Sequence, residues 1–284
     1  MAEMLSGTPV AAAITEALLP RAEALKQRGV IPCLALLRVG ERTDDLAYER
    51  ASVSRCAKTG IAVRQFVLPA DVSQAVLMQT IAGINRDASI HGCLMFRPLS
   101  AHLDEAAACA ALDPQKDVDG ITAASMALVY SGVGVGFAPC TAQSCMELLR
   151  YYGVDIAGKR VAVVGRSLVI GKPVAMLLTA ADATVTLCHS KSPDLPETVR
   201  AADLAVVAVG RAEALGRECF RPGQTVLDVG INWSAARQKL VGDVDFDAVS
   251  QLVAAITPVP SGVGSVTAAV LCKHVIEAAE STVL

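Results

Sequence analysis

Apolar segments of strand length alternate with helical patterns along the whole 284-residue chain, and this alternation limits what the chain can fold into. Each segment is short, continuous and rich in branched aliphatic residues, which is typical of a strand buried in a parallel sheet. Strands that alternate with helices form such a sheet, with helices on its faces. The candidate strands are 33–39, 61–68, 92–96, 161–165, 183–189, 204–210, 224–230 and 253–256. We therefore expect an α/β protein with parallel sheets.

The candidate strands fall into two groups, which indicates two domains. Helical patterns over residues 44–58 and 72–86 separate the first three strands, and Asp71 is a candidate cap for the second helix. The glycine-rich segment YSGVGVGF precedes Pro139, where we place the boundary. A final amphipathic helix starts near Ser265 and needs a surface for its apolar face, so we expect it to return to the first domain.

Composition argues against several functional classes. The formal net charge is -3 and the basic residues are scattered singly, which is unlike a nucleic-acid footprint. No apolar stretch approaches the roughly 18 residues that span a bilayer, and the segment MAEMLSGTPV lacks the features of a secretory signal. We therefore expect a cytoplasmic protein. Its nine cysteines form no C-x-x-C pair, so we expect buried, reduced thiols and no metal site.

The segment VAVVGRSLVIGKP, residues 161–173, is a candidate phosphate site. A strand that stops at Gly165 and a helix that opens at Gly171 leave backbone N–H groups free to face an anion. Arg166 adds a guanidinium suited to phosphate, and Ser167 follows it. The segment is not the usual G-x-G-x-x-G fingerprint, so a plain strand-to-helix connection is the alternative.

The end of the next strand favours NADP over NAD. About 20 residues after the glycine turn of a dinucleotide fold, an acidic residue binds the ribose of NAD, whereas a basic group accommodates the additional phosphate of NADP. Here the strand ends in His189, Ser190 and Lys191, with no carboxylate. The alternatives are that Arg166 is simply exposed and that His189 only hydrogen-bonds the strand end.

Two later strands end in glycine at the edge where a parallel sheet binds its ligand. Gly210 ends one of them, and Gly230 with Ile231 ends the other. Glycine lets the backbone approach a flat ring closely, so these residues are candidate neighbours of the nicotinamide. Taken singly, each glycine is equally compatible with an ordinary turn.

Seven segments of the chain match, in order, the signature segments of the methylenetetrahydrofolate dehydrogenase/cyclohydrolase family, which the chain therefore resembles. They are PQKDVDGI (114–121), PCTA (139–142), VVGRSLVIGKP (163–173), TVTLCHSKS (184–192), DVGIN (228–232), VGDVDF (241–246) and TPVPSGVGSVT (257–267). The resemblance implies a catalytic folate domain at 1–139, completed by the C-terminal helix 265–284, and a Rossmann NADP-binding domain at 140–264. It also implies a folate cleft at their junction and a homodimer.

The resemblance also implies roles for single residues. Arg166 and Ser190 would hold the NADP phosphate, Asp119 would hold the pterin, and the ring of Tyr48 would lie against the substrate. A pterin presents two adjacent N–H donors, which one carboxylate can accept. The alternative is that Asp117 or Asp119 only stabilises a turn, and that Tyr48 is a core or interface residue.

Four departures from the family pattern fall in the implied folate half. Ser52 stands where the family has a lysine, and Phe96 stands where it has a glutamine. Asp45 replaces a serine, and Pro260-Ser261-Gly262 replaces a proline-glycine-glycine turn.

The two reactions of the family differ in what they need. Oxidation of the methylene bridge needs two aligned rings and no proton transfer, whereas hydrolysis of the methenyl product needs a group that activates water. A lysine beside an amide fits that work, and Ser52 beside Phe96 does not. We expect an NADP-dependent methylenetetrahydrofolate dehydrogenase with reduced or absent cyclohydrolase activity. The alternatives are a fully bifunctional enzyme that uses Arg50 or Arg97, and a non-catalytic regulatory protein that binds folate or NADP.

Overall fold

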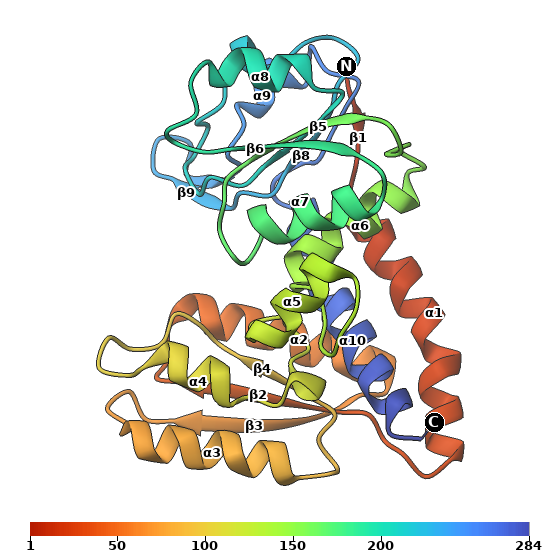
Figure 1. Ribbon diagram of the computed structural model, residues 1–284, viewed down its shortest axis with the longest axis vertical. Coiled ribbons are helices and arrows are strands. Elements are labelled where there is room, and N and C mark those ends of the chain that lie inside the picture. Colours follow the sequence, from red (N-terminus) through yellow and green to blue (C-terminus); the bar gives the residue numbers. More distant parts are fainter. Residues whose placement is uncertain (284) are drawn as a thin grey trace. The chain divides into compact units, whose positions relative to one another are not determined.

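The computed structural model describes residues 1–283, which form two compact units (Figure 1). Unit 1 contains Met1–Ala11 and Thr141–Thr267. Unit 2 contains residues 12–140 together with the chain from Ala268 on. Each unit is built on a parallel sheet with helices around it, so the expected α/β class is confirmed.

Unit 1 is built on a six-stranded parallel sheet with the strand order β1-β11-β8-β7-β5-β6. The strands are β1 (Glu3–Met4), β5 (Arg160–Val164), β6 (Thr184–Cys188), β7 (Leu204–Val207), β8 (Thr225–Asp228) and β11 (Ala255–Ile256). The chain passes from β5 to β6 on one side and then to β7 on the other. The strand order therefore reverses between β5 and β7, which is the point at which open parallel sheets bind ligands.

Helices and a small hairpin complete unit 1. The helices are α6 (Cys140–Tyr151), α7 (Gly171–Ala180), α8 (Leu195–Ala201) and α9 (Phe246–Val249), with short 3-10 turns at η2 (Arg217–Cys219) and η3 (Val263–Ser265). The hairpin pairs β9 (Asn232–Ser234) with β10 (Lys239–Val241) in antiparallel fashion.

Unit 2 is built on a three-stranded parallel sheet with the order β3-β2-β4. The strands are β2 (Cys33–Val39), β3 (Ala62–Leu68) and β4 (Gly92–Met95). The helices are α1 (Gly7–Gln27), α2 (Thr43–Thr59), α3 (Gln74–Arg86), α4 (Glu105–Ala111), α5 (Ala123–Ser131) and α10 (Thr267–Ser281), with a 3-10 turn at η1 (Pro114–Lys116).

Side-chain periodicity explains the core of unit 2. Every residue of β2 is buried, and alternate residues from Cys33 to Val39 belong to one apolar cluster. Leu77, Ile81 and Ile84 of α3 join that cluster, because their spacing places them on one face of the helix. Helix α3 therefore covers this face of the sheet.

The C-terminal helix α10 lies within unit 2 from Ala268 on. Arg21 of α1 forms an ion pair with Glu280 of α10, at 2.6 Å, and His274 of α10 contacts the carbonyl oxygen of Val118 at 2.9 Å. These contacts join α10 to segments far away in the sequence.

Several boundaries differ from the sequence predictions by a few residues, and three of these differences bear on the caps and the domains. The cap of α3 is Ser73, whose hydroxyl accepts a hydrogen bond from the N–H of Val76 at 3.4 Å, so the prediction of Asp71 was wrong. The first residues of the predicted domain 1–139 belong to unit 1, because β1 pairs with β11. Helix α10 starts at Thr267 instead of residue 265, and the last residue of the predicted helix 265–284 lies outside the described residues.

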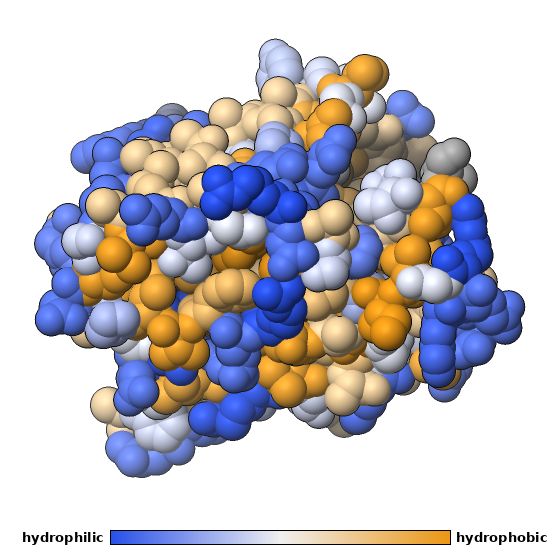
Figure 2. Space-filling model, turned by 90° about the horizontal axis from the view of Figure 1, so that it is seen from below, coloured by the Kyte–Doolittle hydropathy of each residue, from blue (hydrophilic) through white to orange (hydrophobic). Residues whose placement is uncertain are grey.

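Strand β3 lies at one edge of the sheet of unit 2, and its residues are mostly partly or fully exposed. Figure 2 views the molecule from the side on which α3 lies in Figure 1, and several apolar patches there are separated by hydrophilic side chains. Within residues 1–283, no helix has the length and apolar character that crossing a membrane requires. The same residues contain no group of three His, Cys, Asp or Glu side chains arranged to hold a metal ion.

Candidate functional site

The carboxyl ends of the parallel strands of unit 1 bring the predicted cofactor residues to one edge of its sheet. Gly165 follows β5, His189 and Ser190 follow β6, Gly210 follows β7 and Gly230 follows β8. Because these strands are parallel and adjacent, their carboxyl ends lie together. The edge includes the reversal of strand order between β5 and β7.

The turn after β5 requires glycine at two positions. Gly165 has a φ of 121°, and a Cβ there would overlap the carbonyl oxygen of Ala208, which follows β7. A Cβ on Gly171 would overlap the carbonyl oxygen of Gly165. The hydroxyl of Ser167 accepts a hydrogen bond from the N–H of Ile170 at 3.2 Å, just before α7 begins. This close turn at a helix N-terminus fits a phosphate group.

Arg166 and the residues after β6 differ in their local contacts. Arg166 and Ser190 are both exposed, and they follow strand residues that pair with each other, Val164 and Cys188. The Nδ1 atom of His189 accepts a hydrogen bond from the N–H of Lys191 at 3.1 Å. His189 therefore has a structural role at this strand end, whereas the exposed positions of Arg166 and Ser190 are compatible with binding of a phosphate.

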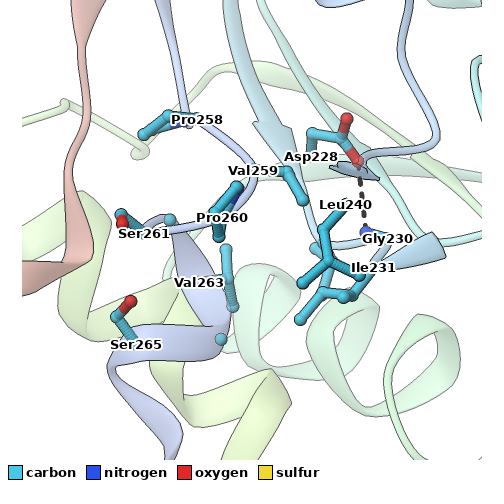
Figure 3. Close-up of a pocket in the computed structure, with 13 residues that line it drawn as sticks. Asp228, Gly230, Ile231, Leu240, Pro258, Val259, Pro260, Ser261, Val263 and Ser265 are labelled. Atoms are coloured by element: carbon cyan, nitrogen blue, oxygen red, sulfur yellow. Dashed lines mark hydrogen bonds between the residues drawn. The ribbon is translucent and has the colours of Figure 1, made fainter. Parts of the chain in front are cut away.

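A pocket of about 220 Å³ lies in unit 1 beside the end of β8 (Figure 3). It is lined by Asp228, Val229, Gly230, Ile231, Leu240 and residues 258–265. In Figure 3, Ile231 and Leu240 lie together on one side, opposite the loop that carries Pro258 and Ser261. The pocket thus brings the predicted cofactor residues Gly230 and Ile231 together with Pro260 and Ser261, which the sequence assigned to the substrate.

Helix α2 of unit 2 presents a row of buried polar residues on its inner face. Asp45, Glu49 and Ser52 are all buried on this face. The hydroxyl of Ser52 has no hydrogen-bond partner among the described residues. Tyr48 is half-buried, and its ring meets that of Phe96 edge to face, with the centroids 6.1 Å apart. Phe96 is only 5% exposed, so an apolar ring occupies the position beside Tyr48.

Asp117 and Asp119 have different surroundings although they are two residues apart. The buried carboxylate of Asp117 accepts hydrogen bonds from the N–H groups of Ile121 and Thr122, at 2.9 and 2.7 Å, and from the hydroxyl of Ser125, at 2.6 Å. Asp117 is therefore the residue that stabilises the turn. Loss of hydration raises the pKa of the Asp119 carboxyl to about 6, although the charge of Arg97 opposes this shift.

The two arginines considered as alternative catalytic groups differ in burial. Arg50 is exposed. Arg97 is partly buried, its Nη1 lies 3.6 Å from Glu105, and its Nε is buried with no hydrogen-bond partner among the described residues. Arg97 is therefore the one whose charge acts on Asp119.

Sequence reasoning missed two features near these residues. The thiol of Cys140 contacts the carbonyl oxygen of Val118 at 3.2 Å and interacts with the carboxyl of Asp119. In unit 1, Asp228 and Asp243 are both buried, and Asp228 lines the pocket. Cys140, Asp228 and Asp243 lie in the segments PCTA, DVGIN and VGDVDF, which match the family. The sequence therefore indicated these positions, but it did not indicate what their side chains do.

The comparisons with known proteins cover nearly the whole chain. Residues 5–119 match the catalytic domain of the tetrahydrofolate dehydrogenase/cyclohydrolase family, and residues 139–283 match its NAD(P)-binding domain. The bifunctional protein FolD of Carboxydothermus hydrogenoformans is 47% identical over 281 residues, which are 99% of this chain and 98% of that protein.

Solved structures agree with this match. The FolD enzyme of Campylobacter jejuni is 35% identical, with a TM-score of 0.96 over 99% of this chain and 100% of that chain. The FolD enzyme of Trypanosoma brucei, solved with NADP cofactor and an inhibitor, is 36% identical, with a TM-score of 0.93 over 99% of this chain and 98% of that chain. Both the sequence and the fold therefore place this chain in the tetrahydrofolate dehydrogenase/cyclohydrolase family.

Proposed function

We propose that this chain oxidises methylenetetrahydrofolate to methenyltetrahydrofolate with NADP, and that its cyclohydrolase activity is reduced or absent. Membership of the family supports the dehydrogenase reaction, and the NADP complex of the Trypanosoma brucei relative supports the choice of cofactor. The bound NADP would supply the acceptor for the hydride that leaves the folate. The protein itself has to bind and align the two ligands.

The residues at the sheet edge of unit 1 fit a dinucleotide that carries a 2′-phosphate. Glycine at 165 and 171 allows the close turn between β5 and α7, because a Cβ at either position would overlap a carbonyl oxygen. The N-terminus of α7, which opens at this turn, can face a phosphate. Arg166 would pair with the 2′-phosphate, and Ser190 would donate its hydroxyl hydrogen to the same group. Gly210, Gly230 and Ile231 would adjoin the nicotinamide.

In unit 2, Asp119 would bind the pterin. Its carboxylate is not used in the local turn, because Asp117 has that role. Tyr48 would place its ring against the folate, and we assign Pro260 and Ser261 to the substrate as well.

The single observation that supports a lost cyclohydrolase activity is the side-chain chemistry at positions 52 and 96, which are a buried hydroxyl and a buried phenyl ring. Hydrolysis requires a group that can take a proton from water and later deliver one to the leaving nitrogen. The buried hydroxyl of Ser52 has no hydrogen-bonded base among the described residues, and Phe96 has no polar side-chain atom. Neither residue can replace an amine that is hydrogen-bonded to an amide.

One observation favours a second candidate function, a fully bifunctional enzyme. The Nε atom of Arg97 is buried without a partner among the described residues, and the charge of Arg97 acts on Asp119. A guanidinium in that position would orient a water molecule or stabilise negative charge, although it is a poor proton acceptor because its pKa stays high.

The test compares NADPH formation with hydrolysis of methenyltetrahydrofolate by the purified protein. We expect oxidation to proceed and methenyl product to accumulate, because general acid-base assistance contributes about a hundred- to ten-thousandfold to such a step. The single change Ser52→Lys should restore little hydrolysis, because Phe96 supplies no amide to which the new ammonium could be hydrogen-bonded. The double change Ser52→Lys with Phe96→Gln should restore more.

Other outcomes identify the rival functions. If the unmodified protein hydrolyses the methenyl compound as fast as it forms it, the proposed loss is wrong, and Arg97→Met, with Arg50→Met as the exposed control, would test the second candidate. Binding of both ligands without any NADPH formation would indicate a non-catalytic regulatory protein.

A further inference from the structure

Two buried carboxylates, one in the lining of the pocket of unit 1 and one outside that lining, connect three strand ends. Asp228 is the last residue of β8, and Asp243 follows β10. The two residues are 2% and 0% exposed, respectively. A buried carboxylate persists in a folded protein only when hydrogen bonds replace its lost hydration, so the partners of these two groups show what they hold in place.

Asp228 fixes the segment that carries Asp243. Its carboxylate accepts hydrogen bonds from the N–H of Gly230 at 3.1 Å and from the N–H groups of Asp243 and Val244, both at 2.9 Å. Its own N–H donates to the hydroxyl of Thr257 at 2.7 Å. The backbone around Asp243 is therefore anchored to the end of β8.

Asp243 in turn holds the loop that follows β7. Its carboxylate accepts hydrogen bonds from three successive N–H groups, those of Val209 at 2.6 Å, Gly210 at 2.9 Å and Arg211 at 2.9 Å. The same carboxylate accepts a fourth bond, at 2.9 Å, from the side-chain amide of Asn232. One side chain thus joins the loop after β7 to the start of β9, which directly follows the loop after β8.

Glycines make room for this arrangement. A Cβ on Gly230 would overlap the carboxylate of Asp243, and a Cβ on Gly242 would overlap that of Asp228. Gly230 is also one of the residues that line the pocket. The wall of the pocket and the anchor behind it are therefore in direct contact.

All four groups that Asp243 binds are N–H donors, so the site requires an acceptor without hydrogen. A carboxylate meets this requirement with two oxygens, whereas an amide would offer one oxygen and turn an NH₂ group toward further donors. The hydrogen bonds to a charged acceptor are also stronger than those to a neutral one.

We propose that Asp243 is a positioning residue for the nicotinamide end of the cofactor, because it sets the loops after β7 and β8 in the arrangement that this ring requires. The inference rests on the proposed function, since it concerns the same dinucleotide. Asp243 acts through the backbone of Gly210 and through Asn232, and it does not touch the reacting atoms.

The test separates the two ends of the cofactor. Binding of NADP and of adenosine 2′,5′-bisphosphate, which lacks the nicotinamide, is measured by calorimetry, and kcat is measured at saturating NADP. For Asp243→Asn we expect unchanged affinity for the bisphosphate, weaker binding of NADP, and a kcat lower by about ten- to a hundredfold, the size of effect that one or two lost charge-assisted hydrogen bonds produce.

Two further variants keep the result interpretable. Asn232→Ala removes only the amide that links the two loops, so it should lower kcat less than Asp243→Asn does and should leave binding of the bisphosphate unchanged, even if Asp243→Asn does not fold. Asp203→Asn is the control, because the carboxylate of Asp203 also accepts from a backbone N–H, that of Arg160 at 3.0 Å, but at the opposite end of the strands. It should bind both ligands and turn over as the unmodified protein does.

Normal kcat in both Asp243→Asn and Asn232→Ala would overturn the inference and leave the proposed function intact. An equal loss of affinity for NADP and for the bisphosphate would also overturn it, because that result indicates general loosening of the unit. If the unmodified protein binds neither ligand, the proposed function itself fails and the inference fails with it.

Discussion

Two neighbouring aspartates show how much the role of a residue depends on its surroundings. Only Val118 separates Asp117 from Asp119. The carboxylate of Asp117 accepts three hydrogen bonds from groups within the turn and the helix that follows it. The carboxylate of Asp119 instead interacts with Cys140 and with the charge of Arg97. The sequence left open which of the two is structural. The hydrogen bonds show that Asp117 stabilises the turn, and the role of Asp119 in binding pterin stays a prediction.

The pH dependence of catalysis tests Asp119. The pKa of its carboxyl is raised by burial from 3.8 to about 6, so the group becomes protonated below about pH 6 and can no longer accept both N–H groups of a pterin. We expect kcat/KM for the folate to fall about tenfold per pH unit below that point, because this ratio reports ionisations of the free enzyme. Asp119→Asn should have a lower kcat/KM without this acid limb.

The raised pKa of Asp119 also affects stability, and in the opposite direction with pH: acid should lower kcat/KM but should favour the folded state. Because the folded state binds this proton more tightly than the unfolded state, the contribution of Asp119 is fully present below about pH 3.8 and is lost as the pH rises through about 6. Asp119→Asn should therefore be at least as stable as the unmodified protein at pH 8. For the kinetic prediction, an Asp119→Asn variant whose kcat/KM still falls at low pH would show that another group titrates.

A substitution at the single residue Arg166 tests whether the protein prefers NADP to NAD. A charge-assisted contact with the 2′-phosphate is worth about 1.5 to 3 kcal/mol, or roughly ten- to a hundredfold in affinity. Arg166→Ala should therefore weaken binding of NADP by that factor and leave binding of NAD nearly unchanged in a fluorescence titration. Equal affinity of the unmodified protein for the two cofactors would contradict the assignment.

At the scale of elements, a buried ion pair connects α2 to the sheet of unit 2. The Nε atom of Arg38 in β2 lies 2.8 Å from the carboxylate of Glu49 in α2. Glu49 also accepts a hydrogen bond from Gln65 in β3, at 2.8 Å. The two charged residues are only 6% and 7% exposed. The pair therefore fixes the helix that carries Tyr48 and Ser52.

Replacing only Glu49 of this ion pair should destabilise the protein more than replacing both Arg38 and Glu49. Glu49→Leu leaves the guanidinium of Arg38 buried and unpaired, which should lower the free energy of unfolding by about 3 to 5 kcal/mol in urea denaturation. The double change Arg38→Met with Glu49→Leu should recover most of that loss. The surface pair of Arg64 with Asp87 is the control, since Arg64→Ala should lower the free energy of unfolding far less than Glu49→Leu does. A double variant as unstable as Glu49→Leu would contradict this account.

The elements that the sequence predicted are those with a strong local signal. Strands β2 and β7 come from largely apolar runs. Strand β2 has the predicted bounds, and β7 begins at the predicted residue and ends three residues earlier than predicted. Helix α1 was not predicted, and it contains Pro20 within a run of mixed alanine, leucine and charged residues. The cap of α3 was misplaced because Asp71 and Ser73 are both capping residue types, and only the backbone decides between them.

The sequence could predict the candidate site only where the functional residues are close together in the chain. The turn from Gly165 to Gly171 is contiguous, so its shape could be anticipated from sequence. The contact of Asp243 with the loop after β7 spans more than 30 residues and depends on the strand order. The interaction of Cys140 with Asp119 likewise depends on how the chain returns after α5.

At the scale of the whole molecule, the open edge of β3 bears on assembly. Among the described residues β3 pairs only with β2, and Val67 on it is 50% exposed. An exposed strand edge is a template for pairing with another chain. We expect a homodimer, as measured by light scattering after size-exclusion chromatography, and we expect Val67→Lys to weaken it. Val133→Lys, at another exposed apolar residue, is the control. A monomer at micromolar concentration would contradict this prediction.

Each unit is formed by two segments that are far apart in the sequence, and this has a consequence for biosynthesis. Unit 1 needs residues 1–11, which are synthesised before most of unit 2, and unit 2 needs α10, which is synthesised after the rest of unit 1. Domains that are continuous in sequence can fold one after another as they are synthesised. Here the core of unit 2 lacks α10 throughout translation of unit 1. Its exposed apolar surface must then be kept from aggregating until α10 has been synthesised.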